Sequence, residues 1–300
     1  MKKNNILMVA LLGAMACVSC QEAFEIEEKQ QPAEPAKKWT LTVQATKGVE
    51  TKALNLVQAQ GQNDVLDAYW VNGEKVAVFS GKDYLGDLTA AVDASDRKKA
   101  TLSATWNEMP DDINGATLTL LFPRNEWNYT GQTGVAPAAD GALSSAYDYA
   151  MATVTANVEG STITTTRADF QNQQNIYRFG FKNIDNESAI SVHKFIVSSD
   201  HLVTRRAFDG AWKSTKGKIT VEQPASSSSE LLYAALRIEQ ETAAAEKLWF
   251  AVFGANSDYY EGTQTIPADY LTNGKFISAK GVKVEQLKLP TKDAEPDKTF

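Results

Sequence analysis

The sequence predicts an all-β protein, and three observations support that prediction. Apolar and polar side chains alternate in short runs, as at Leu41, Val43 and Ala45, which is the spacing of a strand with one buried face. Asn-Gly and Asp-Gly dipeptides, which favour tight turns, separate several of these runs. Helix-like windows are short and lie only at 240–247 and 268–271. We therefore expect antiparallel β-sandwiches.

The N-terminus has the layout of a signal peptide. Lys2 and Lys3 precede an apolar run over 6–16, which is too short to cross a hydrocarbon core of about 30 Å. Small residues lead up to Cys20 and an acidic segment follows, an arrangement that resembles a bacterial lipoprotein cleavage site. We predict that residues 1–19 are removed and that Cys20 becomes the acylated N-terminus. The alternative is ordinary cleavage that leaves an incidental cysteine.

The charge balance argues against a nucleic-acid partner. The 300 residues contain 30 basic and 37 acidic side chains, for a net charge of −7. Removal of residues 1–19 takes away two lysines and no acid, so 28 basic and 37 acidic side chains remain and the net charge becomes −9. Nucleic-acid binding needs the opposite sign. With Cys20 acylated no disulfide can form, so stability must come from a packed core.

The strand pattern begins after an acidic tether and divides into two sets. Residues 20–38 are rich in Glu and Pro and are expected to be disordered. A polar, Thr-rich stretch then separates two groups of strands, which places an N-terminal β-sandwich at 39–165 and a C-terminal β-sandwich at 166–289. Residues 290–300 form a polar tail. The expected strands lie at 39–45, 76–79, 118–122, 151–158, 177–181, 195–197, 219–221, 232–238, 248–252 and 276–289.

The residues needed for catalysis are not found in a recognisable arrangement. His193 and His201 are eight residues apart, whereas zinc ligands on one element are about two to five residues apart. The sequence contains no nucleophile elbow, Walker loop or dinucleotide-binding fingerprint. Its acidic pairs lack the alternation of a calcium loop. We expect a protein that is not an enzyme and that uses no cofactor and no metal.

Several short segments resemble, in the same order, those of one known family. Residues 69–79 (YWVNGEKVAVF) resemble a W-x-x-G-D-x-I-x-V-F segment, 121–123 (LFP) a Tyr-Pro step, and 146–152 (AYDYAMA) a D-Y-M-x-A segment. Residues 259–263 (YYEGT) and 271–276 (LTNGKF) resemble a Y-x-G-T and L-x-x-G-K-x-Y ending. These are the motifs of the fimbrillin-like lipoproteins of Bacteroidales, the major and minor fimbrial subunits.

The resemblance implies two transthyretin-like β-sandwich domains in tandem and a structural role in a cell-surface fimbria. In that family the lipidated precursor reaches the surface of the outer membrane, and a trypsin-like protease cuts after an Arg or Lys that follows the first strand. A strand from a neighbouring subunit then fills the groove. The implied partners are other fimbrial subunits, the outer membrane through the lipid anchor, and host or bacterial surface ligands.

Carried onto this chain, the resemblance makes 39–45 the removable strand. Cleavage would follow Lys52 or Lys47, and we favour Lys52 because its polar neighbours are typical of a loop; ordinary loop lysines are the alternative. Residues 276–289 are about twice as long as a typical strand, so half of them could act as a donor strand. Whether this segment is a donor or an intrinsic strand stays open. The donor candidates are Val282, Val284, Leu287 and Leu289.

A second interpretation is a monomeric surface lipoprotein that binds glycans. The aromatic pairs Trp127/Tyr129 and Tyr259/Tyr260 could stack on sugar rings, although burial in a β-sandwich core is the alternative for them. Clustered exposed aromatic side chains on one face would distinguish this interpretation from the fimbrial one.

Overall fold

A computed structural model describes residues 37–47, 68–134, 148–224, 227–274 and 276–287. Cys20, Lys52 and Leu289 lie outside these residues, as do the signal peptide, most of the tether and the polar tail. The regular elements of the described chain are strands, apart from the 3-10 helix η1 at Ala268–Tyr270, and the all-β prediction is confirmed. The other helix-like window, 240–247, is irregular and ends in a strand.

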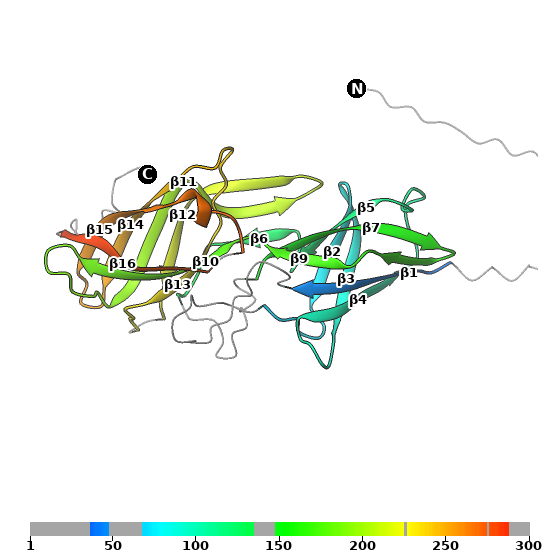
Figure 1. Cartoon of the computed structure of the whole chain (residues 1–300), viewed down its shortest axis with the longest axis horizontal. Helices are drawn as coiled ribbons and strands as arrows, with labels where there is room; N and C mark the ends of the chain where they lie inside the picture. Colours follow the sequence, from blue (N-terminus) through cyan, green and yellow to red (C-terminus); the bar gives the residue numbers. More distant parts are fainter. Residues whose placement is uncertain (1–36, 48–67, 135–147, 225–226, 275, 288–300) are drawn as a thin grey trace, which may run out of the picture. The chain divides into compact units, whose positions relative to one another are not determined.

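The first sheet closes on itself through its first strand. Its eight strands pair in the order β4-β3-β2-β5-β7-β8-β1-β9, and β1 also pairs with β4 (Figure 1). The path that starts at β4 therefore returns to β4 through β1. The strands are β1 (Trp39–Lys47), β2 (Lys75–Ser80), β3 (Asp83–Val92), β4 (Lys99–Trp106), β5 (Thr117–Phe122), β7 (Ala150–Glu159), β8 (Thr162–Thr165) and β9 (Ala168–Asn172).

The described strands of the second sheet do not form a closed ring. The last strand of the described chain lies near the middle of this sheet and not at its edge. Its strands pair in the order β12-β11-β14-β15-β16-β10-β13, and β6 pairs with β11 beside this path. The strands are β6 (Glu126–Asn128), β10 (Asn175–Asn183), β11 (Val192–Phe208), β12 (Trp212–Glu222), β13 (Leu232–Leu236), β14 (Glu246–Gly254), β15 (Tyr259–Ile266) and β16 (Phe276–Leu287).

The expectation of purely antiparallel sheets is wrong at both ends of the described chain. β1 runs parallel to β8 and β9, and β16 runs parallel to β10. A short hairpin forces its two strands to be antiparallel, but these strands lie far from their parallel partners along the chain. Their direction is therefore not fixed by a hairpin turn.

β9 of the first sheet ends at Asn172 and β10 of the second sheet begins at Asn175, and the domain boundary at 165/166 stays a prediction. The Thr-rich stretch forms β8, which turns back on β7 through Gly160 with φ of 63°, and β9 follows. In the other direction, β6 precedes β7 in the chain but pairs with β11. Threonine favours strands through its β-branched side chain, even where bulky apolar groups are few.

The alternation along the strands builds two apolar cores. Leu41 and Val43 of β1 and Val76 of β2 belong to the first core. Phe79, on the opposite face of β2, belongs to the second core, where its ring lies 5.2 Å from that of Phe208. Strands such as β2 are thus buried on both faces. The centre of the second core is the ring cluster Phe179, Phe181, Phe195 and Phe250.

Candidate functional site

The predicted removable strand, β1, pairs with other strands along both of its edges. β1 is antiparallel to β4 from Trp39, opposite Trp106, to Thr46, opposite Lys99. Its other edge is parallel first to β8 and then to β9. β1 therefore has neighbours on both edges, and without it both β4 and the β8–β9 side would present unpaired backbone groups.

The inward face of β1 is apolar until its last residue. Leu41 and Val43 are fully buried and Ala45 is 3% exposed. Burial of a Leu or Val side chain contributes about 1.5–3 kcal/mol. These side chains fill part of the first core, so the place of β1 is an apolar groove once the strand is absent.

Lys47 continues the same inward alternation and is only 1% exposed. Its Nζ donates to Asp148 Oδ2 at 2.7 Å and to Glu74 Oε2 at 3.3 Å. The same nitrogen lies 4.2 Å from the ring centroid of Trp70 and 3.7 Å from that of Phe122. We call Trp70, Glu74, Phe122 and Asp148 the Lys47 cage. Two carboxylates and two rings compensate the buried ammonium group.

The Lys47 cage brings together three of the segments that carry the family resemblance. Trp70 and Glu74 come from the 69–79 segment, Phe122 from the 121–123 segment and Asp148 from the 146–152 segment. Trp70 packs edge-on against Phe122 at 5.5 Å between ring centroids. Sequence reasoning identified each segment but did not identify their meeting point. The sign in the sequence that could have located this meeting point is the two-residue alternation of the strand. It puts the Lys47 side chain on the same face of β1 as that of Leu41.

A further contact fixes the end of β1 to β9. Thr46 Oγ1 donates to Asp169 Oδ1 at 2.6 Å, and Arg167 Nε donates to the same oxygen at 2.8 Å. These hydrogen bonds, with that of Thr46 first, lower the pKa of Asp169 below its usual value because they favour the ionised carboxylate.

The structure separates the two predicted cleavage sites. A trypsin-like protease must take the lysine side chain into its own pocket, and the burial of Lys47 prevents this while β1 is in place. Lys52 lies outside the described residues, so cleavage after Lys52 stays a prediction. Between the two, the burial of Lys47 favours Lys52.

The predicted donor residues lie mostly in the second sheet. Val282 and Val284 are each 1% exposed and belong to the chain's own second core. Leu287 pairs with Tyr259, the first residue of β15, and Leu289 lies outside the described residues. β16 lies between β10 and β15, so in this state it is an intrinsic strand. A donor role would require these residues to leave their own sheet.

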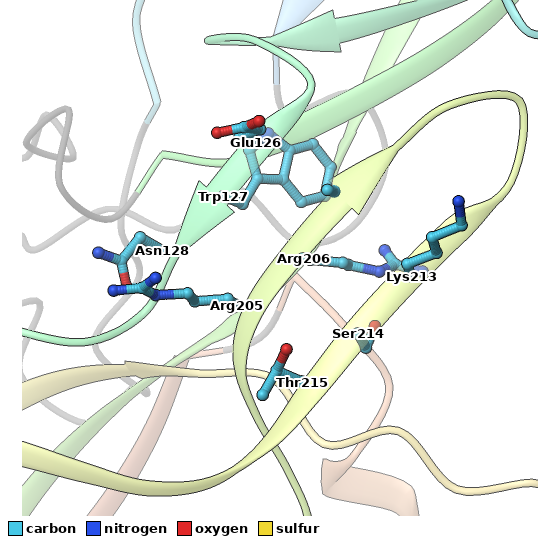
Figure 2. A pocket seen from close by; sticks show the side chains of 9 residues that line it. Glu126, Trp127, Asn128, Arg205, Arg206, Lys213, Ser214 and Thr215 are labelled. Atoms are coloured by element: carbon cyan, nitrogen blue, oxygen red, sulfur yellow. The ribbon is translucent and has the colours of Figure 1, made fainter. Parts of the chain in front are cut away.

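A second candidate site is a cationic cavity beside β6. It has a volume of about 580 Å³ and is lined by residues of β6, β11 and β12. Figure 2 shows Trp127 on β6 facing Arg206 on β11, with Lys213 and Ser214 along β12. Sequence reasoning missed this cavity because the pairing of β6 with β11, across some eighty residues of chain, has no local signal.

Arg206 is the buried cation of this cavity. Its side chain is 9% exposed, and its guanidinium lies 4.0 Å from the ring centroid of Trp212. Nε is 2.9 Å from Glu239 Oε1, a carboxylate that also pairs with Arg237 at 2.6 Å. Among the described residues, Arg206 Nη1 has no hydrogen-bond partner. Burial and the neighbouring Arg237 lower the pKa of Arg206 to about 10. Because Nη1 is itself buried, the donors that the cavity offers to an anion are the exposed side chains of Arg205 and Lys213.

The other predicted side chains do not assemble a site. Four aromatic side chains are at most 7% exposed, so none offers a ring face to a sugar: Trp127, Tyr129, Tyr259 and Tyr260. The described part of the chain holds no group of three or more His, Cys, Asp or Glu side chains arranged to bind a metal ion. Among the same residues, no helix has the length and apolarity to cross a membrane.

Comparisons with known proteins give distant structural likenesses. No family model matches the chain, and no curated protein matches it. A candidate cell adhesion protein of Bacteroides uniformis has a TM-score of 0.45 at 13% identity, over 83% of this chain and 96% of that one. A second, from Bacteroides ovatus, has a TM-score of 0.41 at 14% identity, over 83% and 95%. A minor pilin of Streptococcus agalactiae has a TM-score of 0.28 at 12% identity, over 85% and 99%. Likenesses at this level do not establish a function.

Proposed function

We propose that this chain is a structural subunit of a cell-surface fimbria that takes part in adhesion and assembles by strand exchange at the place of β1. The precursor is lipidated at Cys20, is held on the outer membrane and is cut after Lys52. The observation that supports this most is that β1, the first strand, closes the first sheet. Its loss leaves one groove with two unpaired edges and an apolar floor, which an extended peptide satisfies.

A cut that frees β1 tests the proposal. A recognition sequence for a site-specific protease is inserted between Lys52 and Ala53, and the purified protein is cut. We expect the β1 fragment to be released and oligomers that survive mild detergent to form, because an inserted strand restores a full ladder of backbone hydrogen bonds. Light scattering after size exclusion gives the mass, and mass spectrometry identifies the released fragment.

The matched control carries the same recognition sequence between Gly141 and Ala142. This cut breaks the chain once as well, but leaves β1 joined to β2 through the backbone. It should give no oligomers. A chain cut after Lys52 that stays monomeric and keeps β1 would overturn strand exchange at this position.

The lipid anchor has its own test. Cys20→Ser should give an unlipidated precursor that partitions into the aqueous phase of a detergent extraction, whereas Cys17→Ser should still carry lipid. Lipid labelling that survives Cys20→Ser would contradict the proposed acylation site.

The cavity at Arg206 favours a second function, the binding of a carboxylated sugar. Arg205 and Lys213 line the cavity with exposed side chains and provide charge-assisted donors for a carboxylate. Calorimetry should then detect glucuronic acid and not glucose, and Arg205→Met should abolish the signal. The control Arg167→Met removes an exposed guanidinium of the first sheet instead. Equal binding of the two sugars, or of neither, would remove this candidate.

A further inference from the structure

We infer that the β1 groove selects its strand by charge: the occupant must carry a lysine or arginine two residues beyond the third of its inward apolar side chains. This inference rests on the proposed strand exchange and states the chemistry of the partner. The occupant is an extended segment of another subunit with the inward pattern of Leu41, Val43, Ala45 and Lys47. It runs in the direction of β1, parallel to β8 and β9.

The residues of the Lys47 cage, which contact this charge, all lie outside β1. Trp70 and Glu74 precede β2, Phe122 ends β5 and Asp148 precedes β7. Trp70 is also held by Phe170 of β9, at 5.2 Å between ring centroids. Glu74 Oε2 accepts a second hydrogen bond, from the backbone N–H of Val71 at 2.9 Å. Trp70, Phe122 and Glu74 therefore have contacts that do not depend on β1, and these contacts keep them at the end of the groove when β1 leaves.

An empty cage leaves a buried carboxylate without compensation. Asp148 is 3% exposed, and its Oδ1 has no hydrogen-bond partner among the described residues. Its Oδ2 accepts from Lys47 Nζ. A strand with a neutral side chain at this position would seal Asp148 into a low-dielectric space with no cation, and an acidic side chain would add a like charge. The groove thus discriminates against such strands.

The charge also sets the direction and register of the strand. Consecutive inward side chains are about 6.6 Å apart, so a slip of two residues moves the cation by that distance. A slip of one residue turns the cation away from the core altogether. A reversed strand would place the cation at the Leu41 end of the groove, far along β1 from the cage. Apolar alternation alone would reject the slip of one residue but would accept the slip of two residues and the reversed strand.

Competition between peptides tests the inference on the full chain cut between Lys52 and Ala53. The cut protein releases its own β1 fragment in dilute urea and is then refolded with a fluorescent peptide of residues 38–48. Unlabelled peptides compete with wild-type sequence, Lys47→Arg, Lys47→Met or Lys47→Glu, and fluorescence anisotropy gives the affinities. We expect Arg to bind within about tenfold of wild type, Met to bind about 100-fold more weakly, and Glu not to compete.

The reciprocal change identifies the cage as the cause. In protein with Asp148→Asn, the preference for the Lys peptide over the Met peptide should shrink to about tenfold or less. Glu74→Gln, a milder change at a partly exposed group, should give an intermediate preference, and it covers the case in which Asp148→Asn fails to fold. Circular dichroism confirms the fold of each variant.

The outcomes separate the two claims. If the four peptides bind equally, the charge selection is wrong and strand exchange stands. If the wild-type peptide does not bind to the emptied protein, strand exchange at β1 fails, and the charge selection fails with it. A preference that persists unchanged in both the Asp148→Asn and Glu74→Gln proteins would assign the selection to some other part of the groove, and would overturn the role of the cage.

Discussion

The first and last strands of the described chain are alike in position and differ in how they end. β1 and β16 both run parallel to a neighbour and both have partners on two edges. β1 ends on Lys47, a buried ammonium group held by the Lys47 cage. β16 runs out through Glu285 and Gln286, which are exposed. Two strands can thus have the same kind of backbone pairing and still differ in what their removal exposes. Removal of β1 would leave the carboxylates of the Lys47 cage without their cation.

The largest expected effect tests the end of β1. Lys47→Met should lower the free energy of unfolding by about 3–5 kcal/mol, because it leaves the carboxylate of Asp148 buried without a cation. Urea denaturation measures the change. The matched control on β16 is Lys283→Met, which removes an exposed ion pair with Glu187 and should leave stability unchanged. Equal effects of the two substitutions would break the comparison.

The next effect concerns the apolar face of β1. Leu41→Ala should cost about 2–5 kcal/mol in the intact protein, since Leu41 is fully buried in the first core. In protein cut after Lys52 it should also speed the release of β1. Val284→Ala on β16 should destabilise the protein without speeding that release. If both substitutions accelerate release, the two strands do not leave independently.

A smaller effect is expected where β16 packs most closely on β15. A Cβ at Gly262 would lie 2.5 Å from the carbonyl oxygen of Lys283, so Gly262→Ala should cost about 1–3 kcal/mol as β16 is pushed away. Gly254→Ala on β14 meets only ordinary contacts at 3.6 Å or more and is the control. Hydrogen exchange should show the loosening in β16 and not in β1. Loosening of β1 instead would show that the two sheets are coupled.

The smallest effect is a pH dependence at the β1–β9 contact. The hydrogen bonds from Thr46 and Arg167 hold the pKa of Asp169 below its unfolded value. Their stabilisation is therefore present above the unfolded pKa of about 3.9 and is lost as the pH falls through the lower folded pKa. Release of β1 from cut protein should quicken below about pH 4. Asp169→Asn should weaken this acceleration, and an unchanged pH profile would assign the effect to other carboxyl groups.

Local patterns predicted the strands but not their long-range partners. The alternation at Leu41, Val43 and Ala45 gave β1 and its buried face. The same alternation includes Lys47, yet the sequence by itself predicts an exposed lysine there, because burial of an unpaired charge is unfavourable. Only the tertiary fold, which brings Asp148 beside it from about a hundred residues away, makes burial favourable. The sequence therefore predicts the face of β1 on which Lys47 lies, but it does not predict the carboxylate that pairs with the Lys47 ammonium group.

The length of the last strand shows the same limit. The run 276–289 exceeds the usual strand length, and from the sequence alone it can be an intrinsic strand or can contribute half of its length as a donor. The structure bends the run at Gly281, where φ is 86° and the register against β10 shifts by one residue. β16 pairs with β10 from Phe276 to Val284 and with β15 from Val284 to Leu287, so the two parts of the run have different neighbours. A glycine within a strand pattern was the available sign of such a bend.

The burial of Lys47 has a consequence for chemical labelling. Amine-reactive reagents attack the neutral, accessible form of a lysine, and Nζ of Lys47 is enclosed by two rings and two carboxylates. Acylation at this position must wait until the strand has left its sheet, whereas lysines on the surface react at once. The modified fraction of Lys47, read by mass spectrometry over time, therefore reports how often the first sheet opens in the uncut precursor.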